Sequence, residues 1–253
     1  MEEKQIIVEN LNINYKIFGS GKPFLVLHGW RSNSDRWQSF SESLSQKNIK
    51  IIVPDMPGFG KSEEPKIAWS ADNYVEWINN FSNAVPELKH GFYLLGHSFG
   101  GMLAAKFTLK YTQKVEKLFL VSASCIRIKT PSKKLAYNIS RIIKIFYFFP
   151  YYELFRKFVY KYIIKRSDYL HVSGIMKDIY LKIISEDLSY KLPFIKVPTI
   201  IVWGPKDDLT PIEHADIIND KIHKSKLVVI PDADHYLNIK IPEVLAQKVL
   251  ENV

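Results

Sequence analysis

Short apolar runs, separated by stretches with helical spacing, recur along most of the chain. The apolar runs predict strands at 24–27, 49–53, 92–95, 115–121, 199–203 and 227–230. Between them, apolar positions three and four residues apart predict helices, one of which carries Tyr74, Trp77, Ile78 and Phe81 on a single face. The other helices are expected over 35–45, from 99 to about 111, from about 211 and from 242. We expect Asp35 to start the first of them.

Most of the predicted strands are apolar at successive positions, which indicates that both of their faces are buried. Such strands, alternating with helices, are typical of a mostly parallel sheet with helices on both faces. The first two runs differ, because residues 5–9 and 12–17 alternate between apolar and polar side chains. They predict an antiparallel pair of strands that turns at Asn10. The fold class is therefore α/β.

The strand–helix alternation stops after Ser124 and resumes at Thr199. The intervening residues form helical runs that are rich in basic and aromatic side chains. In open α/β sheets, ligands bind outside the carboxyl ends of the strands. We therefore interpret 127–192 as an inserted helical lid over those ends, and 1–126 together with 193–253 as the core domain.

The net charge of +9 is concentrated in this predicted lid. Residues 127–191 contain 14 Lys and Arg against 5 Asp and Glu, whereas the rest of the chain contains 21 of each. Lys157, Lys161 and Lys165 recur every four residues and form one helix face, which we expect to be solvated. The alternatives are contact with an anionic membrane surface and steering of anionic substrates. We expect no nucleic-acid partner.

Two further features concern the compartment. The chain has one cysteine, Cys125, and so cannot form an intramolecular disulfide. Residues 1–19 lack the basic and apolar regions of a signal peptide, and no uncharged apolar stretch approaches about 18 residues. We expect a cytoplasmic protein.

A tight turn with one hydroxyl at its apex follows the predicted strand at 92–95. The residues Gly96-His97-Ser98-Phe99-Gly100 match G-x-S-x-G, in which small residues allow a strained strand-to-helix turn. This geometry would expose the Ser98 hydroxyl, with the N–H of Phe99 beside it at the start of a helix. The motif is short, so its meaning depends on whether the chain also supplies a base, an acid and a second oxyanion donor.

Polar residues at the ends of other strands supply these groups. Ser98, the turn Gly204-Pro205-Lys206-Asp207 and the turn ending in His235 each follow one of three buried strands. The order Ser, Asp, His is the one expected for an α/β-hydrolase. Five local motifs match that family in order, namely HGW, DMPGFGKS, GHSFGG, WGPKD and the DH before Tyr236. The chain therefore resembles the α/β-hydrolase superfamily over essentially its whole length. It is most similar to the small lidded esterase-like members.

The chemistry of a serine nucleophile requires a base, which His235 can provide because the pKa of histidine is ordinarily about 6.5. The resemblance implies that Asp207, and not its neighbour Asp208, orients this histidine. It also implies that the backbone N–H of Trp30 joins that of Phe99 in the oxyanion hole. His28 and His97 are expected to serve turn architecture. Neither a cofactor nor a metal is expected.

Several other patterns were weighed against this interpretation. Gly60-Lys61-Ser62 is like the end of a phosphate-binding loop, but that motif requires Gly at the position of Asp55. Asp232 and Asp234 beside His235 have no companion cluster with metal-ligand spacing. Asp234 itself departs from the small residue usual in the family, and Lys240 stands where many members have Glu. Arg31 is expected at a solvated surface, the alternative being contact with an anionic substrate group.

The sequence therefore predicts a serine hydrolase that cleaves a small or medium carboxylic ester through an acyl-enzyme. Ser at the elbow argues against dehalogenase and epoxide hydrolase chemistry, which the resemblance associates with Asp. Thioesterase, lipase-like and carbon–carbon bond hydrolase activities share the triad and stay open, as do amide and lactone cleavage. The alternative from another class is a ligand-binding protein that keeps this fold with little turnover.

Overall fold

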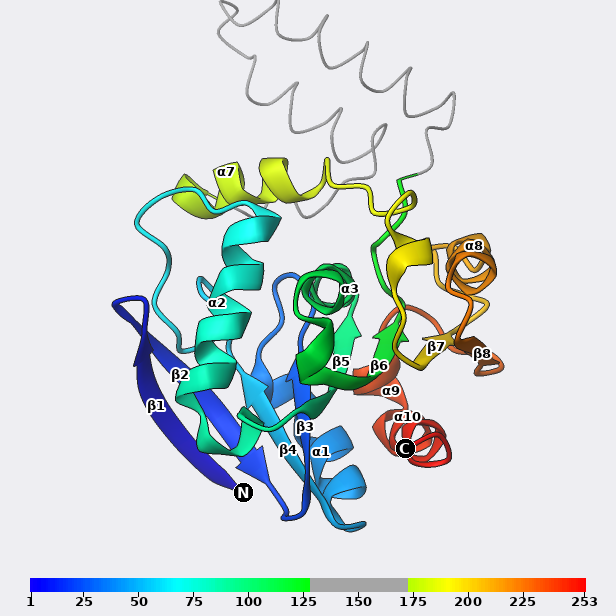
Figure 1. Ribbon diagram of the computed structural model, residues 1–253, viewed down its shortest axis with the longest axis horizontal. Helices are drawn as coiled ribbons and strands as arrows, with labels where there is room; N and C mark the ends of the chain where they lie inside the picture. The colour runs from blue at the N-terminus through cyan, green and yellow to red at the C-terminus, as the bar shows by residue number, and fades with distance from the viewer. Residues whose placement is uncertain (128–172) are drawn as a thin grey trace, which may run out of the picture.

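A single eight-stranded sheet forms the centre of the computed structural model, which describes residues 1–127 and 173–253 (Figure 1). The strand order is β1-β2-β4-β3-β5-β6-β7-β8. β1 pairs antiparallel with β2 and β2 antiparallel with β4, whereas all later pairs are parallel. The predicted mostly parallel α/β sheet is confirmed. The strands are β1 (Glu2–Val8), β2 (Leu11–Phe18), β3 (Lys22–Leu27), β4 (Ile49–Pro54), β5 (Phe92–His97), β6 (Val115–Val121), β7 (Thr199–Trp203) and β8 (Ser225–Val229).

Helices cover both faces of this sheet, with α2 and α3 on one side and α1 and α10 on the other (Figure 1). The α-helices in the described ranges are α1 (Gln38–Ser45), α2 (Ala71–Ala84), α3 (Phe99–Lys110), α7 (Gly174–Ile183), α8 (Glu213–Lys221), α9 (Leu237–Lys240) and α10 (Pro242–Leu250). Short 3₁₀ turns are η1 (Ser34–Trp37), η2 (Pro86–Leu88), η3 (Thr112–Lys114) and η4 (Leu192–Phe194).

The central strands are apolar at every position because their alternate side chains enter two different cores. In β3, Leu25 and Leu27 belong to the core with α2 and α3, whereas Phe24 and Val26 belong to the core with α1 and α10. All four side chains are fully buried. Burial of such a side chain stabilises a fold by about 1.5–3 kcal/mol, so both cores hold the sheet in place.

The N-terminal hairpin has the predicted turn, with Glu9 and Asn10 both in the left-handed region at φ 53° and 61°. The predicted start of the first helix is wrong. The 3₁₀ turn η1 comes first and is capped by Asn33, whose side chain accepts a hydrogen bond from the Arg36 N–H at 3.3 Å, and α1 begins at Gln38 with no side-chain cap. The Asp35 carboxylate instead forms an ion pair with Lys16.

The segments on either side of residues 128–172 are hydrogen-bonded to each other. The N–H of Leu188 donates to the Cys125 carbonyl at 2.9 Å, and Nε of Arg127 donates to the Ile184 carbonyl at 2.9 Å. Helix α7, which lies above α2 and α3 in Figure 1, buries Met176 and Ile179 in the core of those helices. The returning part of the predicted lid is therefore attached firmly to the core.

The remainder of the lid prediction lies outside the described residues. This applies to the basic face of Lys157, Lys161 and Lys165 and to the aromatic runs around them. The predicted lid boundaries of 127 and 192 stay a prediction. No helix in the described ranges is long and apolar enough to cross a membrane.

Candidate active site

Ser98 lies at the apex of a strained turn between β5 and α3. Its φ of 52° and ψ of −114° are unusual for a residue with a side chain. The turn requires glycine on both sides of Ser98, because the backbone is closely packed there. A Cβ on Gly96 would lie 2.2 Å from the Gly100 carbonyl oxygen, and a Cβ on Gly100 would lie 2.2 Å from the Leu27 carbonyl oxygen. The Ser98 carbonyl accepts the N–H of Ser124 at 3.0 Å, which fixes the turn from the neighbouring strand end.

Asp207 and His235 form a buried pair at the carboxyl ends of the neighbouring strands. Oδ2 of Asp207 lies 2.8 Å from Nδ1 of His235, and the two residues are 4% and 5% exposed. Burial alone would raise the pKa of Asp207, but hydrogen bonding and charge interaction with His235 outweigh it and lower that pKa overall. The carboxylate is therefore ionised, and it can stabilise an imidazolium at His235.

His97 connects this pair to the serine turn. Its Nε2 lies 2.9 Å from the His235 carbonyl oxygen, and the two imidazole rings are 5.0 Å apart between centroids. Burial lowers the pKa of His97 to about 3, so the ring is neutral and its Nε2–H donates to that carbonyl. Ser98 thus follows directly on a residue that contacts His235. In residues 1–127 and 173–253 no direct hydrogen bond joins Ser98 to His235.

The turn after β3 lies against the serine turn. A Cβ on Gly29 would lie 3.4 Å from the Cβ of Ser98, so the backbone preceding Trp30 approaches Ser98 closely. His28 secures this turn, because Nδ1 lies 2.8 Å from the Gly29 carbonyl oxygen and Nε2 accepts the Met56 N–H at 3.0 Å. Burial lowers the pKa of His28 to about 4, which keeps the ring neutral for both contacts. This arrangement agrees with turn architecture as its role.

The two predicted oxyanion donors are brought together by their side chains. The Trp30 ring contacts that of Phe99 at 5.4 Å between centroids, and it also contacts Phe59 at 4.9 Å. Phe99 is the first residue of α3, where backbone N–H groups have no partner within the helix. Phe99 therefore borders the Ser98 turn at a helix N-terminus, where developing negative charge is favoured, and the Trp30 side chain packs against it.

Asp55 organises the turn after β4 that is like the end of a phosphate-binding loop. Its carboxylate accepts the N–H of Ser34 at 2.6 Å, the N–H of Lys61 at 2.9 Å and the amide of Asn14 at 3.0 Å. A Cβ on Gly60 would lie 2.3 Å from this carboxylate. The backbone N–H of Lys61, which a phosphate would need, is therefore already bonded to a protein carboxylate.

The residues near His235 that differ from the usual family pattern form an ion pair. Asp234 pairs with Lys240 and accepts the Tyr236 N–H at 2.9 Å, so the two unusual residues of this turn contact each other. Asp232 pairs with Lys206 at 2.6 Å. The described residues contain no group of three His, Cys, Asp or Glu side chains arranged to hold a metal ion.

Two contributors to the site were missed by the sequence reasoning. Thr210 donates its hydroxyl to Asp207 at 2.8 Å, and Tyr180 of α7 contacts Trp30 at 5.3 Å between ring centroids. The position of Thr210 three residues after Asp207 was a usable signal, because such spacing returns a side chain to its own turn. Nothing local marks Tyr180, whose contact depends on how α7 packs.

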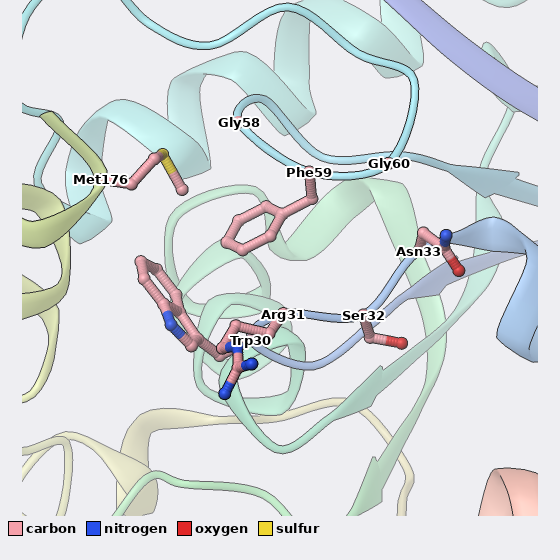
Figure 2. A pocket seen from close by; sticks show the side chains of 8 residues that line it. All are labelled: Trp30, Arg31, Ser32, Asn33, Gly58, Phe59, Gly60 and Met176. Carbon is pink, nitrogen blue, oxygen red and sulfur yellow. The ribbon is translucent and has the colours of Figure 1, made fainter. Parts of the chain in front are cut away.

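An open pocket of about 290 Å³ lies beside the Trp30 turn. Figure 2 shows the Trp30, Phe59 and Met176 side chains converging on one side of it. Arg31 is exposed and is the one charged residue that the described ranges contribute to its lining. The described lining residues are Trp30, Arg31, Ser32, Asn33, Gly58, Phe59, Gly60 and Met176.

Comparison with known proteins agrees with this geometry. A family model described as the alpha/beta hydrolase fold matches residues 22–171. The chain belongs to the α/β-hydrolase-fold family.

Its relatives within that family are distant. Lipase 3 of Moraxella sp. (strain TA144) is 24% identical over 247 residues, covering 92% of this chain and 76% of the lipase. Among solved structures, an esterase from Thermogutta terrifontis has a TM-score of 0.75 at 21% identity, covering 99% of this chain and 97% of the esterase. A meta-cleavage product hydrolase from Pseudomonas fluorescens IP01 has a TM-score of 0.73 at 22% identity, covering 98% and 96%. At these identities the structural likeness concerns the fold.

Proposed function

We propose that this protein is a serine hydrolase that cleaves a small or medium carboxylic ester through an acyl-enzyme. The observation that carries the proposal is the buried Asp207–His235 pair, 2.8 Å apart and linked through His97 to the strained turn of Ser98. A structural turn has no need of an ionised carboxylate behind a histidine at this place. The names of the relatives, lipase and esterase, support the same class of substrate.

The first half of the reaction transfers the acyl group to the enzyme. Oγ of Ser98 attacks the ester carbonyl carbon while Nε2 of His235 takes its proton. The carbonyl oxygen becomes an oxyanion, which the backbone N–H groups of Phe99 and Trp30 stabilise. Collapse of the tetrahedral intermediate breaks the bond to the alcohol oxygen, and His235 returns the proton to that oxygen. The alcohol leaves, and the acyl group remains on Ser98.

The second half repeats these steps with water as the nucleophile. His235 takes a proton from water, the hydroxide attacks the acyl carbon, and the same two N–H groups bind the oxyanion. Breakdown releases the acid as Ser98 recovers its proton from His235. Asp207 stays ionised throughout and holds the imidazole with Nε2 toward the serine.

The pocket beside Trp30 supports a substrate of small or medium size. Its volume of about 290 Å³ lies near the lower end of the roughly 300–1,000 Å³ usual for ligand pockets. Residues 127–192 form the lid in this proposal, and Met176 and Tyr180 are the side chains that α7 contributes near the oxyanion donors. The lid would then set the acyl-chain length.

Labelling with a fluorophosphonate, together with hydrolysis of p-nitrophenyl esters from acetyl to decanoyl, tests the proposal. The wild-type protein should be labelled and should prefer the shorter chains, whereas Ser98→Ala should show neither labelling nor hydrolysis above background. Ser82→Ala is the matched control, since Ser82 is buried in α2 and bonded to the Asn79 carbonyl. Hydrolysis surviving in purified Ser98→Ala would refute the nucleophile. Rapid labelling without turnover of any ester or thioester would favour a binding protein.

A further inference from the structure

The backbone N–H and the hydroxyl of Thr210 both contact the proposed acid and base of the candidate site. Its N–H donates to Oδ1 of Asp207 at 2.7 Å, and its hydroxyl donates to Oδ2 of the same carboxylate at 2.8 Å. The hydroxyl oxygen also lies 3.3 Å from Nδ1 of His235. Oδ2 is the oxygen that contacts His235, so threonine and histidine converge on one carboxylate oxygen.

The backbone of Thr210 is held in place independently of these contacts. The indole N–H of Trp203, at the end of β7, donates to the Thr210 carbonyl at 2.7 Å. Pro211 follows and restricts the backbone of the preceding residue to extended conformations. Thr210 is 6% exposed, so water does not compete for its hydroxyl. The hydroxyl is therefore a fixed group, not a surface side chain that happens to lie nearby.

The protons of this cluster can be assigned from its geometry. When Nδ1 of His235 carries a hydrogen, it donates that hydrogen to Oδ2 of Asp207. The one hydroxyl hydrogen of Thr210 then points at Oδ2, 2.8 Å away, because the Ser122 carbonyl is farther at 3.2 Å. A lone pair of the hydroxyl faces Nδ1–H. Without this hydroxyl, Oδ2 keeps its contact with Nδ1 of His235 but loses the contact with Thr210, because the N–H groups of Leu209 and Thr210 both bind Oδ1.

We infer that Thr210 is a positioning residue, whose hydroxyl keeps Oδ2 of Asp207 directed at Nδ1 of His235. This inference rests on the proposed function for its effect on catalysis. A carboxylate whose Oδ2 is bound by the imidazole alone can move together with that ring, which reduces the fraction of His235 with Nε2 aimed at the serine. A hydrogen bond to a charged group is worth enough to change a rate about 10- to 100-fold.

Replacement of the hydroxyl by a methyl group in Thr210→Val tests the inference. The variant should lower kcat on a short p-nitrophenyl ester about 10- to 100-fold while KM changes less than about twofold, because Thr210 does not line the described pocket. Thr210→Ser should restore most of kcat. Thr199→Val is the matched control, since Thr199 is equally buried and its hydroxyl donates to the Val197 carbonyl at 3.1 Å.

A second measurement needs no substrate. In protein labelled with ¹⁵N-histidine, NMR reports the hydrogen-bonded Nδ1–H of His235, assigned by its loss in His235→Gln. In Thr210→Val this resonance should move upfield and exchange faster with water, and in Thr210→Ser and Thr199→Val it should stay at the wild-type position. If wild type is inert toward esters, the proposed function fails, and this resonance still decides the role of Thr210.

A wild-type Nδ1–H resonance in Thr210→Val overturns the inference, and so does Thr210→Ser with the same loss of kcat as Thr210→Val. If thermal unfolding shows that Thr210→Val is not folded at the assay temperature, Thr210→Ala removes the same hydroxyl within a smaller side chain. Its resonance and kcat are then judged by the same criteria.

Discussion

The rings of Trp30 and Tyr180 lie 5.3 Å apart between centroids, at an interplanar angle of 49°. Trp30 belongs to the turn after β3 and carries a proposed oxyanion N–H, whereas Tyr180 lies on α7, the returning end of the predicted lid. The tyrosine therefore packs against the side chain of Trp30, and the backbone just before Trp30 lies beside the proposed nucleophile, Ser98. Changes in α7 should reach the chemistry through this contact.

Tyr180→Ala should lower kcat/KM on short esters by about 2- to 10-fold, because Trp30 loses one of the rings that hold its turn and an aromatic contact is worth about 0.5–1.5 kcal/mol. Leu181→Ala, one residue along the same helix and 45% exposed, is the control and should change kcat/KM less than about twofold. Steady-state kinetics of both variants make the comparison. Equal effects of the two substitutions would mean that α7 acts through its general stability.

Asp207→Asn should lower kcat about 10³- to 10⁴-fold at neutral pH, because an amide can donate to Nδ1 of His235 and hold the wrong tautomer. The adjacent Asp208 is exposed, so Asp208→Asn should keep nearly wild-type activity. Ester hydrolysis and fluorophosphonate labelling rates measure both variants. The reverse ranking would move the role of the acid to Asp208.

Acidification should destabilise the fold through the two buried turn histidines. Burial lowers the pKa of His28 to about 4 and that of His97 to about 3, below their ordinary value of about 6.5. Between pH 6.5 and about 4 the unfolded chain thus binds protons that the folded chain does not. As the pH is lowered through this range, the free energy of unfolding therefore decreases by up to about 1.4 kcal/mol per pH unit for each histidine. This contribution is complete above about pH 6.5 and is lost as the pH falls.

Urea unfolding between pH 7 and pH 4.5 measures this slope, and His97→Gln tests its source. The glutamine amide can still donate to the His235 carbonyl but does not titrate, so the slope should fall by up to about 1.4 kcal/mol per pH unit. His90→Gln, at an exposed position, is the control. An unchanged slope in His97→Gln would show that other groups cause the acid sensitivity.

Gly100→Ala should lower the free energy of unfolding by about 3 kcal/mol or more. The new Cβ would lie 2.2 Å from the Leu27 carbonyl oxygen and would force β3 away from the Ser98 turn. Gly174→Ala isolates the cost of backbone conformation, since Gly174 has a φ of 56° and nothing within 4 Å of its added Cβ. That cost is about 1 kcal/mol. Urea unfolding compares the two, and equal losses would argue against the close packing at Gly100.

The amino-acid sequence was enough to predict the strands, their mostly parallel pairing and the residues at their carboxyl ends. Apolar runs such as Phe24–Leu27 and the spacing of Gly96, Ser98 and Gly100 are local patterns, and local patterns are readable in one dimension. The position of His235 followed from the same rule, because parallel strands bring their ends to one edge, whereas the choice of Asp207 over Asp208 came from the family resemblance. The failure at the start of the first helix is equally local, since Asn33 and Asp35 are both good cap residues; Asn33 caps η1, and Asp35 pairs with Lys16 of β2.

The side chains that pack around these turns could be identified only from the three-dimensional structure. The contact of Tyr180 with Trp30 joins residues 150 positions apart and depends on the packing of α7. The hydrogen bonds to the Asp55 carboxylate depend on strand register, which brings Asn14 of β2 close to it. Thr210 is close to Asp207 in sequence, yet its hydroxyl reaches Oδ2 because Trp203 and Pro211 hold its backbone. Distances of this kind follow from how packed elements meet, and no single stretch of the chain encodes them.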